Sequence, residues 1–279
     1  NCSKTQLQHA FPLLKQLAES SLQLYKSIAR EENIDFSFQE KGLLTLYKNK
    51  RSFINAKKSI SYFQDQGFSL QVLEAQDVQS IEKNIQKVSG GIYSKHDAHL
   101  SPSLFISKLC DIISQRGGEI HPNTEILSFM KEGKKIKKVD TTKGDFQFDQ
   151  LILSAGAFTT PILQKLDIKI PLQPAKGYSI SYTQKEQTIQ KALMLDDARV
   201  VVTPLGQELR FSGLLDLVGF NDRLYEKRFQ YIYRSIRDFI QKILSIGIIT
   251  TTGISTINGL YNARKGSTIM RSTVPIKGL

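Results

Sequence analysis

Histidine is the side chain that most often serves as a metal ligand or as a base near neutral pH, and it occurs four times in this sequence. His96 and His99 stand close together with Asp97 between them, whereas His9 and His121 lie elsewhere in the chain. The histidines show no ligand spacing beyond this pair, and no further ligand accompanies the pair and Asp97. The sequence therefore predicts no metal site, and it identifies no catalytic residue.

Cysteine chemistry is equally sparse, because the chain contains only Cys2 and Cys110. Two cysteines form neither a disulfide framework nor a zinc site, so a reducing, cytoplasmic setting is expected. Cys110 lies beside the apolar stripe of an expected helix, and we interpret it as a buried structural thiol.

Short motifs that carry a nucleophile or a phosphate group are also missing. The sequence contains no GxSxG elbow, no HExxH, no CxxC, no P-loop lysine motif and no GxGxxG fingerprint. The last of these would place a dinucleotide pyrophosphate at a helix N-terminus. Motifs alone therefore support neither hydrolytic nor nucleotide-binding chemistry.

The net charge of +12, from 38 basic and 26 acidic residues, is the next chemical feature. Residues 221–279 hold ten Lys and Arg against three acids and so contribute +7 of it. A basic surface attracts nucleic acid or an anionic membrane, but no nucleic-acid-binding motif is present. No run reaches the ~20 apolar residues of a bilayer span. We expect no specific nucleic-acid partner, and peripheral association with the inner membrane stays open.

Five helices are expected from apolar residues at helical spacing. The clearest begins after Ser101 as N-cap, with Pro102 at the first helical position, and ends at Gly117. Pro12 should likewise occupy the first turn of an earlier helix. The other expected helices span residues 12–30, 51–66, 75–85 and 223–245. The apolar stripe expected to be buried on the clearest helix is Phe105, Leu109, Ile112 and Ile113.

Strands are expected where β-branched and aromatic residues alternate with polar ones between turn residues. The expected strands span residues 42–49, 68–74, 119–121, 126–131, 134–141, 146–148, 176–183, 200–205 and 209–217. The run LILS (151–154) is continuously apolar, as in a strand covered on both faces. Helices and strands in this order predict an α+β fold.

Six short segments follow one another in a fixed order along the chain. They are GLLTLY (42–47), SGGIYSKHDAHLSPSLF (89–105), GGEIHPNTEI (117–126), KKVDTTKGDFQFDQLILSAGAFT (137–159), PLQPAKGYSI (171–180) and LRFSGLLDL (209–217). Together they resemble the FAD-dependent D-amino-acid dehydrogenase and glycine oxidase family of flavin oxidoreductases. The resemblance covers about residues 1–220, and KGLLTLY, HDAHLSP and PAKGYSI make it most similar to the bacterial D-amino-acid dehydrogenase branch.

The resemblance implies two stretches of cofactor-binding residues. NTEI (123–126) resembles the strand that passes the adenosine end of FAD, which makes Thr124, Glu125 and Ile126 candidate contacts; an ordinary strand start after Pro122 is the alternative. SAGAFT (154–159) resembles a turn at which main chain approaches the cofactor. The small residues suit that approach, and the candidates are Ala155, Gly156 and Ala157.

The resemblance also implies two substrate-binding residues on strands that cover the flavin ring. Tyr178 of KGYSI either hydrogen-bonds a substrate carboxylate or covers the ring. Arg210 of LRFSG is either a bidentate carboxylate ligand or a surface charge, since the family's usual carboxylate-binding arginine lies further on. We expect both side chains to face one cavity. Ser212-Gly213 replaces the usual Gly-Gly.

The resemblance further predicts an FAD-binding domain interleaved with an antiparallel-sheet substrate domain. Residues 1–38 and 98–163 would form the remainder of the former, and 39–97 with 164–220 the latter; residues 221–279 would add a helix and a divergent basic tail. Leu151–Leu153 should be buried among elements of 101–150, and Gly177–Tyr182 should pair with strands of 200–217. The N-terminal glycine-rich turn and the usual C-terminal segment of the family are not found in the sequence, which suggests truncation or a frame shift.

The function implied by the resemblance is oxidative deamination of a D-amino acid or related small amine, with FAD as cofactor and a quinone or oxygen as electron acceptor. Two alternatives stay open. One is a flavin-free binding module that uses the same sheet, and the other is a basic adaptor for nucleic acid or a membrane surface. Without a glycine-rich phosphate loop, the chain as given is expected to retain no FAD and to oxidise no D-amino acid.

Overall fold

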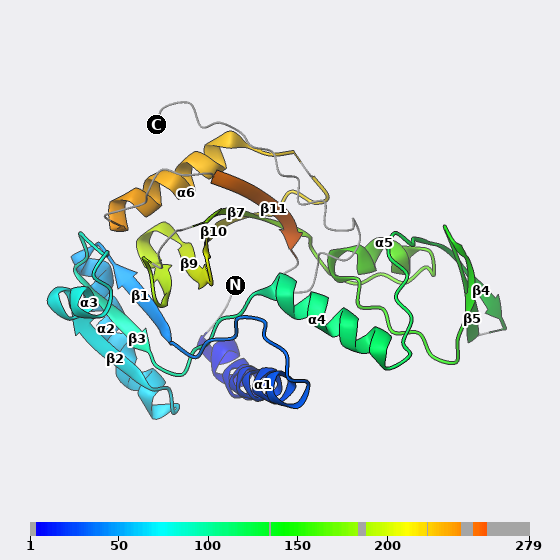
Figure 1. Ribbon diagram of the computed structural model, residues 1–279, viewed down its shortest axis with the longest axis horizontal. Helices are drawn as coiled ribbons and strands as arrows, with labels where there is room; N and C mark the ends of the chain where they lie inside the picture. Colours follow the sequence, from blue (N-terminus) through cyan, green and yellow to red (C-terminus); the bar gives the residue numbers. More distant parts are fainter. Residues whose placement is uncertain (1–3, 134, 184–187, 222, 241–247, 256–279) are drawn as a thin grey trace.

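The computed structural model describes residues 4–133, 135–183, 188–221, 223–240 and 248–255. Within them, helices and strands follow one another irregularly, and the strands form two separate sheets (Figure 1). The helices are α1 (Lys4–Glu31), α2 (Lys50–Asp65), α3 (Ala75–Ile81), α4 (Pro102–Gln115), α5 (Thr159–Gln164) and α6 (Glu226–Phe239), with the short 3₁₀ helices η1 (Gly156–Phe158) and η2 (Asp196–Ala198). The α+β prediction is confirmed.

Local capping explains where two of the predicted helices begin. The Asn49 side chain accepts hydrogen bonds from the amides of Arg51 (2.8 Å) and Ser52 (3.2 Å) at the start of α2. Ser101 caps α4, with Pro102 in its first turn, as predicted. The prediction for Pro12 is wrong, because α1 begins at Lys4 and the proline lies inside the helix.

The large sheet contains eight strands in the order β11-β7-β10-β9-β8-β1-β3-β2. It joins strands from residues 43–94 with strands from residues 175–216, and the predicted pairing of Gly177–Tyr182 with β10 is confirmed. The β1–β8 pair is parallel, so the sheet is mixed rather than purely antiparallel. Its strands are β1 (Leu43–Tyr47), β2 (Leu70–Glu74), β3 (Gly90–Ser94), β7 (Ala175–Thr183), β8 (Ala192–Leu195), β9 (Val200–Leu205), β10 (Glu208–Asp216) and β11 (Ile248–Ser255).

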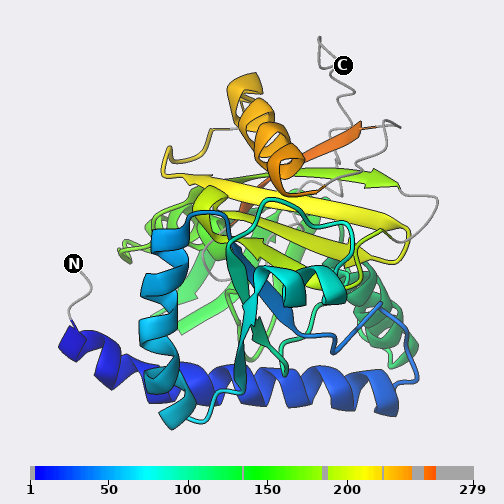
Figure 2. The same cartoon turned by 90° about the vertical axis from the view of Figure 1, so that its left-hand side faces the viewer.

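One face of this sheet carries the core. Side chains at alternate positions of β7, β9 and β10 are buried against α6, including Tyr178, Ile180 and Phe211. The α6 helix contributes Phe229, Ile232, Ile236 and Phe239 to the same cluster. In Figure 2 α6 crosses above the sheet, while α1 runs along the opposite side of the molecule. The fold therefore leaves the second face of these strands directed toward α1 and α4.

The small sheet is an antiparallel meander of β4 (Ile126–Glu132), β5 (Lys135–Thr141) and β6 (Gly144–Gln147). It lies at one end of the molecule, next to α5 (Figure 1). Lys165, which follows α5, donates hydrogen bonds to the carbonyls of Ile126 (3.0 Å) and Leu127 (2.8 Å). These contacts join the segment after α5 to the start of β4. The stretches 124–126 and 155–157, which the resemblance relates to the cofactor, therefore lie in one part of the molecule, which we call the small lobe.

Two strands expected in this lobe are absent from the described part of the chain. Residues 119–121 and 151–154 pair with no strand there, and Ile152 is 84% exposed. The expected burial of Leu151–Leu153 is therefore wrong. The α4 stripe is also more open than predicted, since Ile113 is 46% exposed. An apolar strand is buried only when neighbouring strands cover it, and the described residues supply none.

Candidate functional site

Residues of β7, β9 and β10 that point away from the core form a polar face. Arg210 of β10 stands directly opposite Ser181 of β7 and Thr203 of β9. Ser212, one pleat further along β10, stands opposite Ser179. We call these five residues the polar face. It combines hydroxyl groups with one cation at adjacent positions; Ser179 and Ser181 are buried, and Thr203, Arg210 and Ser212 are half-buried.

Arg210 has unusually few partners on this face. Its Nη2 donates to Ser179 Oγ over a long 3.4 Å, and its Nε is buried without a hydrogen-bond partner in the described structure. No Asp or Glu of the described residues forms an ion pair with it. The guanidinium group thus keeps most of its donor capacity.

Tyr178 lies on the opposite face of the same sheet and is 2% exposed. Its hydroxyl donates to Asp216 Oδ2 (3.1 Å), and its ring packs edge-on against Phe229 of α6. Burial, followed by the hydrogen bond and the charge of Asp216, raises the pKa of Tyr178 to about 12. Tyr178 pairs with Gly213, which lies three positions from Arg210 on β10. Successive side chains of a strand point to opposite faces, so Tyr178 and Arg210 lie on opposite sides of the sheet. The prediction that they face one cavity is wrong.

A network around Tyr178 was not expected from the sequence. Arg228 of α6 donates to both oxygens of Asp216, at 2.6 and 3.1 Å. Lys176 is 1% exposed, donates to the carbonyl of Arg223, and lies 5.5 Å from the centroids of two rings, those of Tyr178 and Tyr225. The only indication of this network in the sequence is Asp216, the acidic residue that ends LRFSGLLD. The network joins α6 to the end of β10.

A bulge in β10 lies next to this network. The register shifts between Gly213 and Leu215, and Leu214 adopts a positive φ of 63°. A Cβ atom at Gly213 would come within 2.9 Å of the Arg199 carbonyl, so the backbone packing there needs glycine. The extra residue directs Leu215 to the same side as the polar face and Asp216 to the core side.

The first cofactor-related stretch leads into β4. Thr124 Oγ1 donates to the Pro122 carbonyl (3.3 Å), and the Glu125 amide donates to Thr142 Oγ1 (3.0 Å). The Glu125 carbonyl accepts from the Thr142 amide (3.0 Å), and Ile126 opens the strand. These contacts fix the backbone and leave the Glu125 side chain exposed.

The second stretch is the turn before α5. Gly156 adopts a φ of 56°, in the left-handed region that glycine favours, and begins η1. Ala157 is fully buried, and the Phe158 amide donates to the Ala155 carbonyl (3.1 Å). A turn of small residues with one left-handed glycine fits close approach of main chain to a cofactor. The described residues contain no glycine-rich turn that opens a helix after a strand, so they supply no phosphate loop for FAD.

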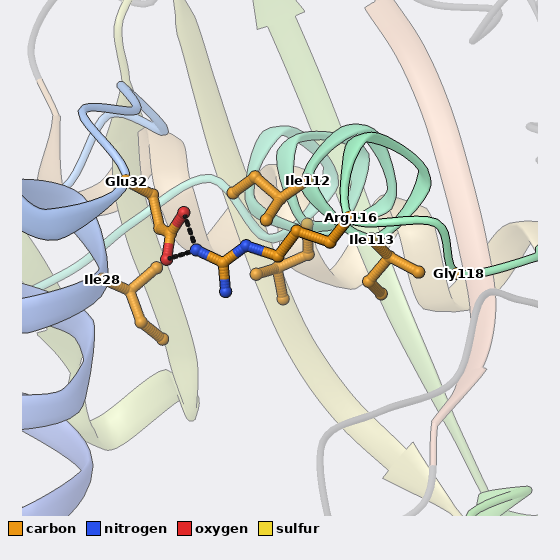
Figure 3. Close-up of a pocket in the computed structure, with 7 residues that line it drawn as sticks. Ile28, Glu32, Ile112, Ile113, Arg116 and Gly118 are labelled. Carbon is orange, nitrogen blue, oxygen red and sulfur yellow. Dashed lines mark hydrogen bonds and ion pairs between the residues drawn. The ribbon is translucent and has the colours of Figure 1, made fainter.

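A groove of about 370 Å³ lies between the C-terminal ends of α1 and α4 (Figure 3). Arg116 and Glu32 form an ion pair at its rim, at 2.6 and 2.7 Å. None of the predicted site residues lines this groove. Its lining is Ile28, Glu32, Leu109, Ile112, Ile113, Arg116 and Gly118.

The histidines and Cys110 form no common site in the described part of the chain. Among the described residues no group of His, Cys, Asp and Glu could hold a metal ion. His99 is buried, and burial, followed by the charge of Lys41, lowers its pKa. Cys110 is a free thiol that is only partly buried, so the interpretation as a buried thiol is wrong.

Comparison with known proteins identifies the family. The sequence model of the family described as "FAD dependent oxidoreductase" matches residues 4–275. This match extends beyond residue 220, where the resemblance of the six segments ended. The D-amino acid dehydrogenase of Vibrio vulnificus (strain CMCP6) is 25% identical over 244 residues, which are 85% of this chain and 58% of that protein. The enzyme of the same name from Neisseria gonorrhoeae (strain NCCP11945) is 24% identical with the same coverage.

Solved structures share the fold. Glycine oxidase from Geobacillus kaustophilus superposes with a TM-score of 0.77 at 16% identity, over 90% of this chain and 69% of that one. L-proline dehydrogenase from P. horikoshii gives a TM-score of 0.73 at 18% identity, over 86% and 66%. No helix in the described residues has the length and apolar character needed to span a bilayer.

The chain spans 58% of the length of the curated relatives it matches. The family match nevertheless covers almost all residues of this chain. It agrees with the family resemblance of the six segments. This protein belongs to the family of FAD dependent oxidoreductases.

Proposed function

We propose that this protein takes part in the FAD-dependent oxidation of the amine of a D-amino acid or a related small amino acid. The observation that carries the proposal is the family match over residues 4–275. The curated relatives named D-amino acid dehydrogenase support the D-amino acid as substrate class. A quinone or oxygen would accept the electrons.

Each lobe of the structure would have its own task. The small-residue turn Ala155–Ala157 and the stretch Thr124–Ile126 would hold FAD by main-chain contacts, in agreement with the left-handed Gly156. FAD, when bound, accepts a hydride from the carbon that carries the amine. The polar face of the large sheet would bind and orient the amino acid beside it.

Proton transfer needs no histidine in this scheme. An amino acid that arrives with a neutral amine would lose its α-hydrogen as hydride and become an iminium ion, which water hydrolyses to a 2-oxo acid and ammonium. His99 is buried, and burial, followed by the charge of Lys41, lowers the pKa of its imidazole and so disfavours the charged form. The task of the protein is therefore to orient the substrate and exclude water.

The experiment supplies the missing phosphate loop. A strand, a GxGxxG turn and a helix are fused in front of the chain, and the fusion is purified with excess FAD. We expect bound flavin and dye reduction that depends on D-alanine. The unfused chain and a fusion with the turn glycines replaced by valine are the controls. Glycine and L-proline, tested in parallel, define the substrate class.

One result would overturn the proposal. If the fusion binds stoichiometric flavin but no amino acid of the panel reduces it, the sheet is a binding module rather than part of an oxidoreductase. Flavin content is measured from the visible spectrum after gel filtration, which separates a failure of cofactor binding from a failure of catalysis.

A further inference from the structure

We propose that α1 pairs with α1 of a second copy of this chain, antiparallel and through an exposed apolar seam, to form a symmetric dimer. The inference concerns assembly and does not depend on the proposed function. The seam consists of the residues Ala10, Leu14, Leu17, Ser21, Leu24 and Ile28.

The seam follows a coiled-coil repeat. Its six residues lie alternately four and three residues apart, a spacing that keeps them on one side of a helix that winds around another helix. The leucines of the seam are open to solvent, since Leu14, Leu17 and Leu24 are 56%, 58% and 61% exposed. Ala10 and Ser21 are exposed as well. In Figure 2 α1 runs along one edge of the molecule, where a second helix can reach it.

A different face of α1 attaches the helix to the rest of the molecule. The ring of Phe11 packs against those of Phe63 and Phe68, with centroids 6.0 and 5.6 Å away. Further along the helix, the ring of Tyr25 packs edge-on against that of Phe105 in α4, at 5.0 Å. The fold therefore already orders α1, and a partner helix does not have to order it on binding.

The sizes of the seam residues favour the antiparallel arrangement. An antiparallel pair can be centred so that the small residues of one helix meet large residues of the other. The opposed pairs are then Leu14 with Leu24, Leu17 with Ser21, and Ala10 with Ile28. A parallel pair would set each small residue against its own counterpart and leave gaps. Antiparallel helices also bring opposite ends of their dipoles together.

The exposed apolar area of the seam reaches what a dimer needs. Leu13, directly beside the seam, is 60% exposed, and Ile113 of α4, near Ile28, is 46% exposed. With the seam leucines, these side chains expose roughly 500 Å² on one copy, which is a large patch for a monomer. A symmetric contact buries the patch on both copies, about 1,000 Å² in all, which is the lower bound for a specific interface.

The groove between α1 and α4 extends the seam. Ile28 lines it together with Ile112 and Ile113 of α4 (Figure 3). In the antiparallel pair, the N-terminal turns of the second α1 pass this end of the seam and bring Leu13 of that copy to the groove. The groove, at about 370 Å³, has room for the leucine side chain.

The charges of α1 do not oppose this contact. The whole chain carries +12, which repels a second copy. The seam itself is uncharged, and so are the positions directly beside it, which are Phe11, Leu13, Ala18, Ser20, Tyr25 and Ser27. Association should therefore strengthen when salt screens the general repulsion.

The test is sedimentation velocity of the 279-residue chain over a range of concentrations, at low and at high salt. We expect a reversible monomer–dimer equilibrium that salt shifts toward the dimer. Leu14→Glu and Leu24→Lys should each weaken dimerisation about 100-fold or more, because a symmetric pair buries each introduced charge twice. The double variant should regain most of the affinity, since antiparallel pairing sets the introduced carboxylate against the introduced ammonium group. Leu127→Glu and Ile152→Lys, at exposed apolar positions away from α1, are controls with the same changes of charge.

Four results would overturn the inference. One is a chain that stays monomeric at every concentration, and another is association that both single variants leave unchanged, because other apolar surface would then cause it. A double variant as weak as the single variants would exclude the antiparallel pairing. A monomer that binds neutral phosphatidylcholine vesicles, and loses this binding on Leu17→Glu, would assign the seam to a membrane. If a charged variant does not fold, judged by circular dichroism, Leu17→Ser decides, because it removes apolar surface without adding charge.

Discussion

Burial and partners, rather than residue type, separate the roles of the two substrate-binding candidates. Tyr178 and Arg210 both lie on central strands, but Tyr178 donates to Asp216 in the core, whereas Arg210 has one long contact on the polar face. A buried hydroxyl with a charged partner stabilises the fold. A half-buried cation without a carboxylate is available to a ligand.

The hydroxyl of Tyr178 should make stability depend on alkaline pH. Because its pKa is raised from 10.0 to about 12, the neutral phenol is favoured in the folded state, and its contribution is present below pH 10. This contribution is lost as the pH rises from 10 toward 12. We predict that wild type loses more thermal stability over this interval than Tyr178→Phe. The measurement is the melting temperature against pH.

At neutral pH the same Tyr178→Phe change should cost about 1 kcal/mol, the usual net value of a hydrogen bond. Tyr62→Phe, at an exposed position of α2, is the control. An identical alkaline decline in wild type and Tyr178→Phe would show that other groups cause it.

At the scale of elements, α6 holds the large sheet in place. Its apolar residues recur at helical spacing, and the structure packs them on β7, β9 and β10. Arg228 adds an ion pair to Asp216 at the end of β10. The helix therefore fixes the strands whose other side forms the polar face.

Shortening a buried side chain of α6 should destabilise the whole sheet. Ile232 is 0% exposed, and Ile232→Ala should lower the free energy of unfolding by about 2–5 kcal/mol through lost burial and a cavity. Arg234→Ala, two residues away and exposed, should change it by about 0.5 kcal/mol or less. Urea denaturation followed by circular dichroism measures both. A small effect of Ile232→Ala would mean that α6 is not part of the cooperative unit.

At the scale of the whole molecule, apolar surface remains open around residues 151–152 and α4. Ile152 is 84% exposed and Ile113 is 46% exposed. Exposed apolar surface promotes association. We predict that Ile152→Lys raises the solubility of the chain and changes its free energy of unfolding by no more than about 0.5 kcal/mol. A clear loss of stability would indicate that Ile152 is buried in solution.

FAD retention is the second property of the whole molecule. The sequence has no GxGxxG turn, and the described residues show no glycine-rich turn opening a helix. Main-chain amides and the dipole at such a turn hold the pyrophosphate. We predict that the 279-residue chain loses added FAD on gel filtration. Elution of a yellow monomer with stoichiometric flavin would contradict this prediction.

The sequence by itself determined most helices and strands, the α+β class and the family. The N-cap Ser101 with Pro102 is a signal that involves only neighbouring residues, and it was enough to predict the start of α4. The alternation of side chains in KGYSISYT is equally local, and it was enough to predict β7. The strand prediction for LILS failed, because burial of an apolar run depends on other segments that cover it. The short β8 gave no usable periodic signal.

Only the tertiary structure decided which candidate residues meet. Alternation along β7 and β10 is visible in the sequence, but their register and the bulge at Leu214 are not. If the register between two strands shifts by one position, every side chain of the shifted strand changes to the other face of the sheet. The register of β7 and β10 therefore decides that Tyr178 packs against α6 and that Arg210 lies on the polar face. The Asp216–Arg228 pair depends on how α6 docks, which is decided by packing between segments distant along the chain rather than by local sequence.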